Sequence, residues 1–147
     1  MSTQRPPVGR RADYFHFMLL QSRWMDNDLY GHVNNVVYYS YFDTLLNRYL
    51  IDHGKLDIHE GPTIGIAVES LCRFHKAFAY PEAIDGGLRV GKLGTSSVRY
   101  EIGLFGQGEN EARAEGHFVH VFVDRKSQRP MSVPPGIRAA LENILVR

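Results

Sequence analysis

The pattern of hydrophobic and polar positions predicts one strand, a long helix, four further strands and a short helix, in that order. Aromatic and aliphatic residues recur at three- and four-residue spacing over residues 36–53, as they do on the buried face of a helix. Asn34 or Asn35 is a candidate N-cap for this helix, and Gly54 is a candidate end. The remaining segments predict strands over 14–24, 63–74, 88–93, 97–105 and 117–124, and a short helix over about 136–146.

The order of these elements favours an α+β class. Four strands follow one another without an intervening helix, and such runs form antiparallel sheets. Aromatic residues lie around much of the circumference of the long helix, so we expect a curved sheet to wrap it. The pair Gly86-Gly87 is expected to form the turn before the strand over 88–93. The sequence therefore predicts a hotdog-like fold, with a long central helix, a five-stranded antiparallel sheet around it and a short C-terminal helix.

Length and composition indicate one globular domain. A chain of 147 residues has the size of a single domain, and a hydrophobic fraction of 44% argues against intrinsic disorder. We assign residues 13–147 to this single hotdog domain. Residues 1–12 contain three arginines and two prolines but no acidic residue, and we expect them to form a flexible N-terminal tail. A transit peptide is the alternative interpretation of this segment.

Charge and cysteine content argue against several classes of function. The chain has 17 basic and 16 acidic residues, and its net charge of +1 argues against a nucleic-acid partner. No apolar run approaches the ~18 residues of a membrane span, so we expect no membrane association. Cys72 is the only cysteine, which rules out an intrachain disulfide and suits a cytoplasmic location. The histidines lack metal-binding spacing, so we expect no metal.

Residues 26–35 form the densest group of polar functional residues in the chain, directly before the long helix. Three interpretations compete. Asp26, Asp28 and Gly31 match positions 1, 3 and 6 of a calcium-binding loop, but Val37 stands where that loop needs a bidentate glutamate. Aspartate, asparagine and glycine also form turns and helix caps, which accounts for Gly31 and one asparagine but not for the two acids.

The third interpretation is a site for acyl transfer. Backbone N–H groups in the first turn of a helix are unpaired and lie at the positive end of the helix dipole. They can therefore stabilise the charge that develops on a thioester carbonyl oxygen. Asp28 precedes this turn and is a candidate general base for water, or a candidate nucleophile. The segment can supply both a carboxylate and an oxyanion site.

One motif resembles the signature of the 4-hydroxybenzoyl-CoA thioesterase family of hotdog proteins. It reads Asp26-x-Asp28-x-x-Gly31-His32-Val33-Asn34-Asn35-x-x-Tyr38, and an apolar helix with Asp43 follows it. The motif is most similar to the branch that carries Gly-His-Val-Asn-Asn and acts on fatty or aryl acyl-CoAs. The similarity extends over roughly residues 15–145. It implies a hotdog fold and hydrolysis of an acyl-CoA to a free acid and coenzyme A.

The resemblance also implies roles for individual residues of the motif. Asp28 takes the place of the catalytic carboxylate, and the backbone N–H of Asn35 takes that of the oxyanion donor. For Asp43 the resemblance implies contact with the substrate. The alternative is an acid on the helix surface that pairs with Arg48 or stays in solvent. Residues implied to contact the substrate are Gly31, His32, Val33, Asn34, Tyr38 and Asp43.

The resemblance further implies that coenzyme A binds in a groove between two copies of the chain, in a homodimer or a homotetramer. No cofactor is implied, because coenzyme A is part of the substrate. Candidate ligands for its phosphates are basic and hydroxyl side chains in later turns, namely Lys92, Ser96, Ser97, Arg125 and Arg129.

Two other functions stay open from the sequence. A hydratase or dehydratase of the same fold pairs aspartate with histidine on an enoyl thioester, and Asp28 with His32 could imitate that pair. The Asn-Pro dipeptide of that branch is missing, because Tyr30-Gly31 stands in its place. A non-catalytic acyl-CoA-binding module would keep the groove without turnover.

Overall fold

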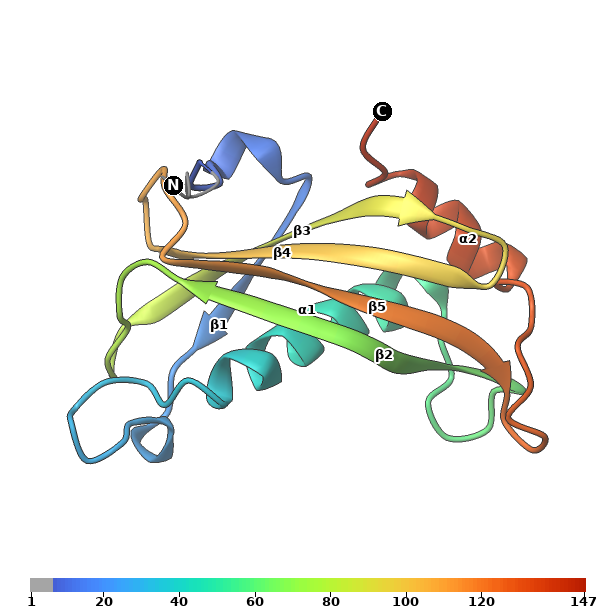
Figure 1. Cartoon of the computed structure of the whole chain (residues 1–147), viewed down its shortest axis with the longest axis horizontal. Coiled ribbons are helices and arrows are strands. Elements are labelled where there is room, and N and C mark those ends of the chain that lie inside the picture. Colours follow the sequence, from blue (N-terminus) through green and yellow to red (C-terminus); the bar gives the residue numbers. More distant parts are fainter. Residues whose placement is uncertain (1–6) are drawn as a thin grey trace, which may run out of the picture.

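A computed structural model describes residues 7–147 of the chain. The strands and the two α-helices follow the predicted order, with a short 3-10 turn on each side of the first strand (Figure 1). The strands are β1 (His16–Gln21), β2 (Thr63–Phe74), β3 (Ala83–Leu93), β4 (Ser97–Gly106) and β5 (Ala114–Asp124). The helical elements are η1 (Arg11–Asp13), η2 (Trp24–Asp26), α1 (Val37–Gly54) and α2 (Pro135–Glu142).

All five strands pair antiparallel in one sheet, in the order β1-β3-β4-β5-β2. The long helix α1 lies across one face of this sheet, and α2 lies at the end of the sheet where β3 finishes (Figure 1). Phe42, Leu45 and Leu46 on α1 are completely buried. Ile102 and Leu104, alternate residues of β4, belong to the same hydrophobic core. The predicted hotdog fold is confirmed.

Strand β3 begins at Ala83 and contains Gly86 and Gly87. The prediction of a turn at this glycine pair is therefore wrong. Both glycines pair with residues of β1. A Cβ atom at Gly86 would lie 3.0 Å from Leu20 Cδ1 and 3.1 Å from Leu45 Cδ2. A larger residue here would crowd side chains of β1 and α1, which is a tertiary reason for glycine that local sequence does not reveal.

The capping of α1 at its start differs from the prediction, whereas its end agrees with it. Neither Asn34 nor Asn35 occupies the N-cap position, which falls on Val36 and has no side-chain cap. Gly54 is the last residue of the helix, as predicted, and Lys55 after it adopts the left-handed conformation, with φ of 55°. The first N–H groups of α1 are therefore left without a capping side chain.

Residues 7–12, the described part of the expected flexible tail, lie against the sheet, while residues 1–6 lie outside the described residues. Arg11 anchors this segment. Its Nη2 atom lies 2.9 Å from Asp85 Oδ2, and its guanidinium carbon lies 5.2 Å from the ring centroid of Phe17. Long-range partners on the sheet order these residues, and the local composition of the segment could not predict them.

Strand β2 is an edge of the sheet and carries exposed apolar side chains. It pairs with β5 on one side and has no partner strand on the other within residues 7–147. Ile66, Val68 and Phe74 are 38%, 62% and 50% exposed. An unpaired edge with apolar side chains is a surface on which another strand can pair.

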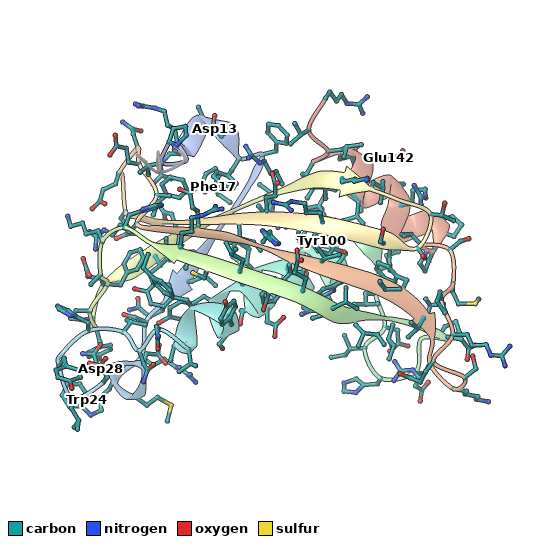
Figure 2. All side chains as sticks on the ribbon, in the orientation of Figure 1. Asp13, Phe17, Trp24, Asp28, Tyr100 and Glu142 are labelled. Atoms are coloured by element: carbon teal, nitrogen blue, oxygen red, sulfur yellow. The ribbon has the colours of Figure 1, made fainter. Side chains whose placement is uncertain are left out.

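Two polar side chains of the core have atoms without hydrogen-bond partners. Tyr100, near the middle of the sheet in Figure 2, is fully buried, and His120 on β5 is 6% exposed. Their ring centroids lie 5.3 Å apart, and neither Tyr100 Oη nor His120 Nε2 has a partner among the described residues. Burial raises the pKa of Tyr100 and lowers the pKa of His120 to about 4. The buried imidazole is therefore neutral at pH 7.

This burial predicts acid sensitivity of the fold. The pKa of His120 is lower in the folded chain than its ordinary value of 6.5, so the unfolded chain binds the proton more readily between pH 6.5 and pH 4. The stability that depends on the neutral imidazole is complete above pH 6.5 and is lost as the pH falls to about 4, by roughly 3 kcal/mol in total. Urea unfolding of His120→Phe at pH 7 and pH 4 should show a smaller pH dependence than the parent. The exposed His59→Gln serves as control, and an unchanged dependence in His120→Phe would contradict the prediction.

Candidate active site

Asp28 lies in the loop between β1 and α1, at one end of the molecule (Figure 2). Asp28 and Asn35 line the same open cavity, which has a volume of about 790 Å³. The two residues expected to perform chemistry therefore face one space. Residues of the same loop complete the lining: Trp24, Met25, Asn27, Leu29, Tyr30, Gly31 and Asn34.

The carboxylate of Asp28 holds its own loop in a tight turn. Its Oδ1 atom accepts the backbone N–H of Tyr30 at 2.8 Å, and the Asp28 N–H donates to the carbonyl oxygen of His32 at 2.9 Å. Gly31 has φ of 83°, a left-handed conformation that glycine adopts at little cost. The Oδ2 atom of Asp28 accepts no hydrogen bond from residues 7–147, so it stays available to a ligand.

Asp26 lies two residues earlier in a very different environment, because its side chain is only 1% exposed. Its Oδ2 atom accepts hydrogen bonds from Tyr41 Oη and from the Arg23 backbone N–H, both at 2.7 Å. Burial alone would raise the pKa of Asp26, but the bonds from Tyr41 and Arg23 bring it below its ordinary value. Asp26 is therefore an ionised group that fastens the loop to α1.

The backbone N–H of Asn35 has no acceptor among the residues that the structure describes. Its neighbours are both engaged, since the Asn34 N–H donates to the Asp26 carbonyl oxygen at 2.9 Å and the Val36 N–H donates to Asn34 Oδ1 at 3.2 Å. Asn35 lies directly before Val36, the N-cap residue of the 18-residue helix α1, and so outside the first turn but near the positive end of the helix dipole. An unpaired N–H in this position can stabilise an oxyanion.

Asn35 also lines a second, smaller cavity of about 270 Å³. Tyr38 contributes to this cavity with a ring that contacts the ring of Phe74 edge to face, at a centroid distance of 4.9 Å. Burial raises the pKa of Tyr38. The cavity connects the motif to the end of β2, and its lining is Val33, Asn35, Tyr38, Phe74, His75, Lys76 and Ala77.

The other residues expected to contact the substrate differ in accessibility. Val33 and Tyr38 are buried, Asn34 is partly buried, and Gly31 and His32 are exposed. The structure therefore gathers all five around the start of α1, but it leaves only some of them open to a ligand.

Asp43 lies two turns along α1 from Asn35 and does not form the pair considered from the sequence. Arg48 Nε instead lies 2.7 Å from Asp52 Oδ2. The Asp43 carboxylate has no ion-pair partner within residues 7–147, and partial loss of hydration raises its pKa. Asp43 is thus left free to meet a ligand or another chain.

Within one chain, the residues expected to bind coenzyme A phosphates do not lie near Asp28. They belong to the β3–β4 hairpin and to the turn after β5, at the end of the sheet opposite the Asp28 loop (Figure 1). Arg125 is engaged there, because its Nε and Nη2 atoms donate to the carbonyl oxygens of Gly61 and Ile58 at 2.6 and 3.0 Å. The other members of the set are Lys92, Ser96, Ser97 and Arg129.

Sequence reasoning missed residues 78–80, which form hydrogen bonds with the Asp28 loop. The Val33 N–H donates to the Phe78 carbonyl oxygen at 2.8 Å, and the Tyr80 N–H donates to Asn27 Oδ1 at 3.0 Å. Residues that are about 50 positions apart in sequence make these bonds. No local pattern signals such contacts, so Asn27 looked like an ordinary turn residue.

Residues 7–147 contain no group of three or more side chains placed to hold a metal ion. In the same range, no helix is both long and apolar enough to cross a membrane.

Comparisons with known proteins relate this chain to thioesterases. A sequence model of the thioesterase-like superfamily matches residues 22–141. The PA5185 protein from Pseudomonas aeruginosa is 51% identical, with a TM-score of 0.93 and coverage of 95% of this chain and 97% of that one. The PA2801 protein from the same organism, proposed to be a thioesterase, is 31% identical, with a TM-score of 0.78 and coverage of 86% and 98%.

Fold similarity extends to more distant proteins. The DHNA-CoA thioesterase from Staphylococcus aureus is 17% identical, with a TM-score of 0.76 and coverage of 87% of this chain and 89% of that one. Among proteins with curated descriptions, none matches the sequence.

Loss of the Tyr41 hydroxyl should destabilise the fold through Asp26. The variant Tyr41→Phe leaves a buried carboxylate without one of its donors, which should lower the free energy of unfolding by about 1–3 kcal/mol. Tyr39→Phe is the matched control, because the Tyr39 hydroxyl donates to no residue of 7–147. Urea unfolding measures both variants, and equal losses would contradict the role of the Asp26–Tyr41 bond.

Proposed function

The chain belongs to the thioesterase-like superfamily and is a thioester hydrolase, and we propose that it hydrolyses fatty or aryl acyl-CoAs to a free acid and coenzyme A. The resemblance expected from the motif is confirmed at the level of this superfamily, and the 4-hydroxybenzoyl-CoA branch stays a prediction. Two structural relatives are named as thioesterases of CoA substrates, for gentisyl-coenzyme A and DHNA-CoA. Their names support coenzyme A as part of the substrate here.

One observation carries the assignment of the site. The unpaired N–H of Asn35 and the free Oδ2 of Asp28 belong to residues that line a single cavity. Hydrolysis of a thioester requires a group that activates the attacking oxygen and a donor that stabilises the oxyanion. One oxyanion donor typically contributes about 2.7–4 kcal/mol to the lowering of the barrier. The pair supplies both requirements within one loop and one helix start.

Two mechanisms use this pair. In the first, Asp28 accepts a proton from water while the water oxygen attacks the carbonyl carbon, and the Asn35 N–H binds the oxyanion. The C–S bond then breaks, and the leaving thiolate takes the proton. In the second, Asp28 attacks the carbonyl carbon, coenzyme A leaves as the thiolate, and water hydrolyses the mixed anhydride. Both mechanisms give the same products.

The remaining residues of the motif position the acyl thioester in this proposal. Gly31 and Asn34 line the larger cavity beside Asp28, and Val33 and Tyr38 line the smaller one. His32 is exposed next to the turn, and Asp43 follows two turns along α1. We assign these residues to substrate contact, with direct chemistry left to Asp28 and Asn35.

A second copy of the chain completes the groove. Strand β2 runs from the end of the sheet near the Arg125–Arg129 turn to the end near Asn35, as Figure 1 shows. Two copies that pair antiparallel along β2 therefore bring the basic turn of one copy toward the Asp28 loop of the other. This supports a homodimer or a dimer-based tetramer in which Lys92, Ser96, Ser97, Arg125 and Arg129 contact coenzyme A from the partner.

No observation favours a hydratase. The one hydrogen bond between His32 and the Asp28 carboxylate within residues 7–147 comes from the His32 backbone N–H, at 3.5 Å, and none joins the carboxylate to the imidazole. Crotonyl-CoA separates the two activities, because a hydratase removes the enone absorbance whereas a thioesterase releases a thiol. A binding module would release no thiol from any acyl-CoA.

Substitution of the Asp28 carboxylate should slow turnover strongly without loss of the fold. Asp28→Asn should reduce kcat for acyl-CoA hydrolysis by roughly 10²–10⁴-fold, because the amide cannot accept the proton of water or attack the carbonyl. Thiol release measures the rate, and circular dichroism checks the fold. Glu142→Gln, at an exposed acid on α2 far from the loop, is the control, and a parent-like rate in Asp28→Asn would overturn the assignment.

Charges placed on the edge strand should separate the copies. Ile66→Lys combined with Val68→Lys replaces two exposed apolar side chains of β2, and like charges then face each other across a paired edge. Sedimentation should show a shift from dimer or tetramer to monomer, together with loss of activity. Ile58→Lys changes an exposed isoleucine outside β2 and should leave the assembly intact. A monomeric parent protein would contradict the shared groove.

A further inference from the structure

Asp28 lies in a short hairpin, residues 27–33, that is closed by its own backbone. The Asp28 N–H donates to the carbonyl oxygen of His32 at 2.9 Å, and the Gly31 N–H donates to that of Asp28 at 3.2 Å. Asn27 and Val33 form an antiparallel bridge at the base of the hairpin. Bonds inside a hairpin fix its shape, but they do not fix where it lies on the molecule. Its position must therefore depend on bonds to other elements.

Two bonds join the hairpin to the connection between β2 and β3. The Val33 N–H donates to the Phe78 carbonyl oxygen at 2.8 Å, and the Tyr80 N–H donates to Asn27 Oδ1 at 3.0 Å. Within residues 7–147, Asn27 is the only residue of the hairpin whose side chain bonds to this connection. Asn27 directly precedes Asp28. A restraint on the Asn27 side chain therefore restrains the backbone that carries the Asp28 carboxylate.

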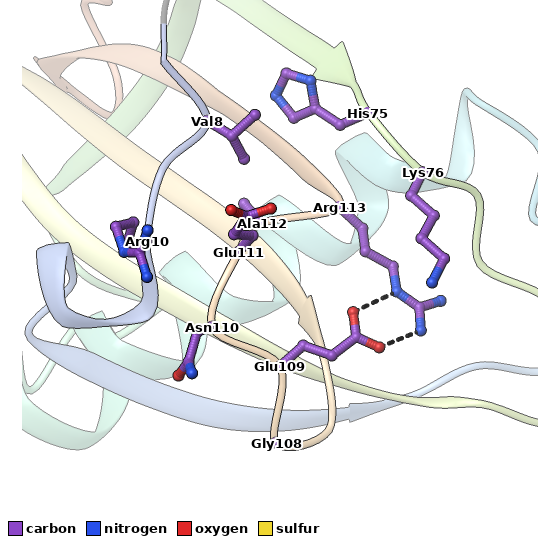
Figure 3. Close-up of a pocket in the computed structure, with 10 residues that line it drawn as sticks. All are labelled: Val8, Arg10, His75, Lys76, Gly108, Glu109, Asn110, Glu111, Ala112 and Arg113. Carbon is purple, nitrogen blue, oxygen red and sulfur yellow. Dashed lines mark hydrogen bonds and ion pairs between the residues drawn. The ribbon is translucent and has the colours of Figure 1, made fainter.

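Arg113 holds the connection between β2 and β3 in place. Its side chain is 10% exposed, and its Nη1 atom lies 3.0 Å from Glu82 Oε1 and donates to the Ala77 carbonyl oxygen at 3.2 Å. Its guanidinium carbon lies 4.7 Å from the ring centroid of Phe78. Arg113 also pairs with Glu109 in the β4–β5 turn (Figure 3). The Tyr80 N–H that meets Asn27 thus belongs to a segment that is itself fixed to the sheet.

We infer that Asn27 is a positioning residue, which holds Asp28 in place relative to the Asn35 N–H. The inference rests on the proposed function and adds a residue to which the motif assigned no role. Asn27 lines the same cavity as Asp28 and Asn35. Because its Oδ1 atom accepts the Tyr80 N–H, Asn27 acts through the position of Asp28 and not on the reacting atoms. A displacement of about 1 Å at a reacting group can slow a reaction by about 10²-fold.

The test removes the acceptor at position 27 and then restores it. Asn27→Ala and Asn27→Leu lose the oxygen that accepts the Tyr80 N–H, and leucine keeps nearly the shape of asparagine. Each variant should lower kcat for acyl-CoA hydrolysis by about 10–100-fold and leave KM within about twofold of the parent. Asn27→Asp restores an acceptor of the same length and should keep kcat within about threefold, with each protein assayed at its pH optimum.

Hydrogen exchange measures the bond itself, without turnover. The Tyr80 amide should exchange with deuterium at least about tenfold faster in Asn27→Ala than in the parent, and at nearly the parent rate in Asn27→Asp. Asn110→Ala is the matched control, because it removes the side chain of an exposed asparagine in the β4–β5 turn. This control should change neither kcat nor the exchange of the Tyr80 amide.

Three results would each overturn the inference. A raised KM with a parent-like kcat in Asn27→Ala would mean that Asn27 contacts the substrate directly. An equal loss of kcat in Asn27→Asp would mean that the acceptor is not what matters, and unchanged exchange at Tyr80 in Asn27→Ala would mean that the bond does not hold the hairpin. If the parent hydrolyses no acyl-CoA, the proposed function itself fails, and the exchange experiment still reports separately whether Asn27 holds the hairpin.

Discussion

The packing of α1 against the curved sheet determines where a functional site can form. Phe42, Leu45 and Leu46 are completely buried on this interface. Each such side chain contributes about 1.5–3 kcal/mol relative to an exposed position. The helix is therefore held along its length, and its first turn emerges at one end of the sheet. The loop from β1 must reach this point, so the Asp28 carboxylate and the Asn35 N–H arrive together.

A buried ion adds the second constraint. Removing the Asp26 carboxylate from water is costly unless hydrogen bonds replace the lost hydration. Tyr41 and Arg23 supply those bonds, and the Asp26 carbonyl oxygen also accepts the N–H of Asn34. The same residue thus joins both ends of the loop and ties them to α1. Burial gives the two acids different roles. Asp26 is enclosed and stabilises the structure, whereas Asp28 keeps one carboxylate oxygen free.

The sequence predicted the elements that have a strong period and missed those that depend on long-range contacts. A period of 3.6 residues located α1 to within one residue at each end, and Thr63–Phe74 was predicted with its observed bounds. The pair Gly86-Gly87 looked like a turn because local sequence cannot show that Leu20 and Leu45 approach it. The motif pointed to the nearness of Asp28 and Asn35, because both lie within eight residues of one another.

Other parts of the site lay beyond local reasoning. The Asp26–Tyr41 bond joins a loop to the inner face of a helix, and neither residue type signals the pairing. Lys76 reaches the cavity of Asn35 from the far end of β2, so only the fold brings the two together. Candidate cations chosen for their turns, such as Lys92 and Arg129, lie at the opposite end of the sheet instead.

Many of the exposed apolar side chains within residues 7–147 lie in the Asp28 loop and on the unpaired edge of β2. Leu29 and Tyr30 in the Asp28 loop are 103% and 88% exposed, and Val68 on the unpaired edge is 62% exposed. Each Å² of this apolar surface that a partner or a substrate covers would contribute about 25 cal/mol of favourable free energy. Isolated apolar residues on a surface need no explanation, but this set surrounds one cavity and one free strand edge. A substrate whose acyl arm covers the loop and a second chain that covers the edge would remove both exposures. Burial of these exposed side chains would therefore favour both the proposed assembly and the proposed substrate binding.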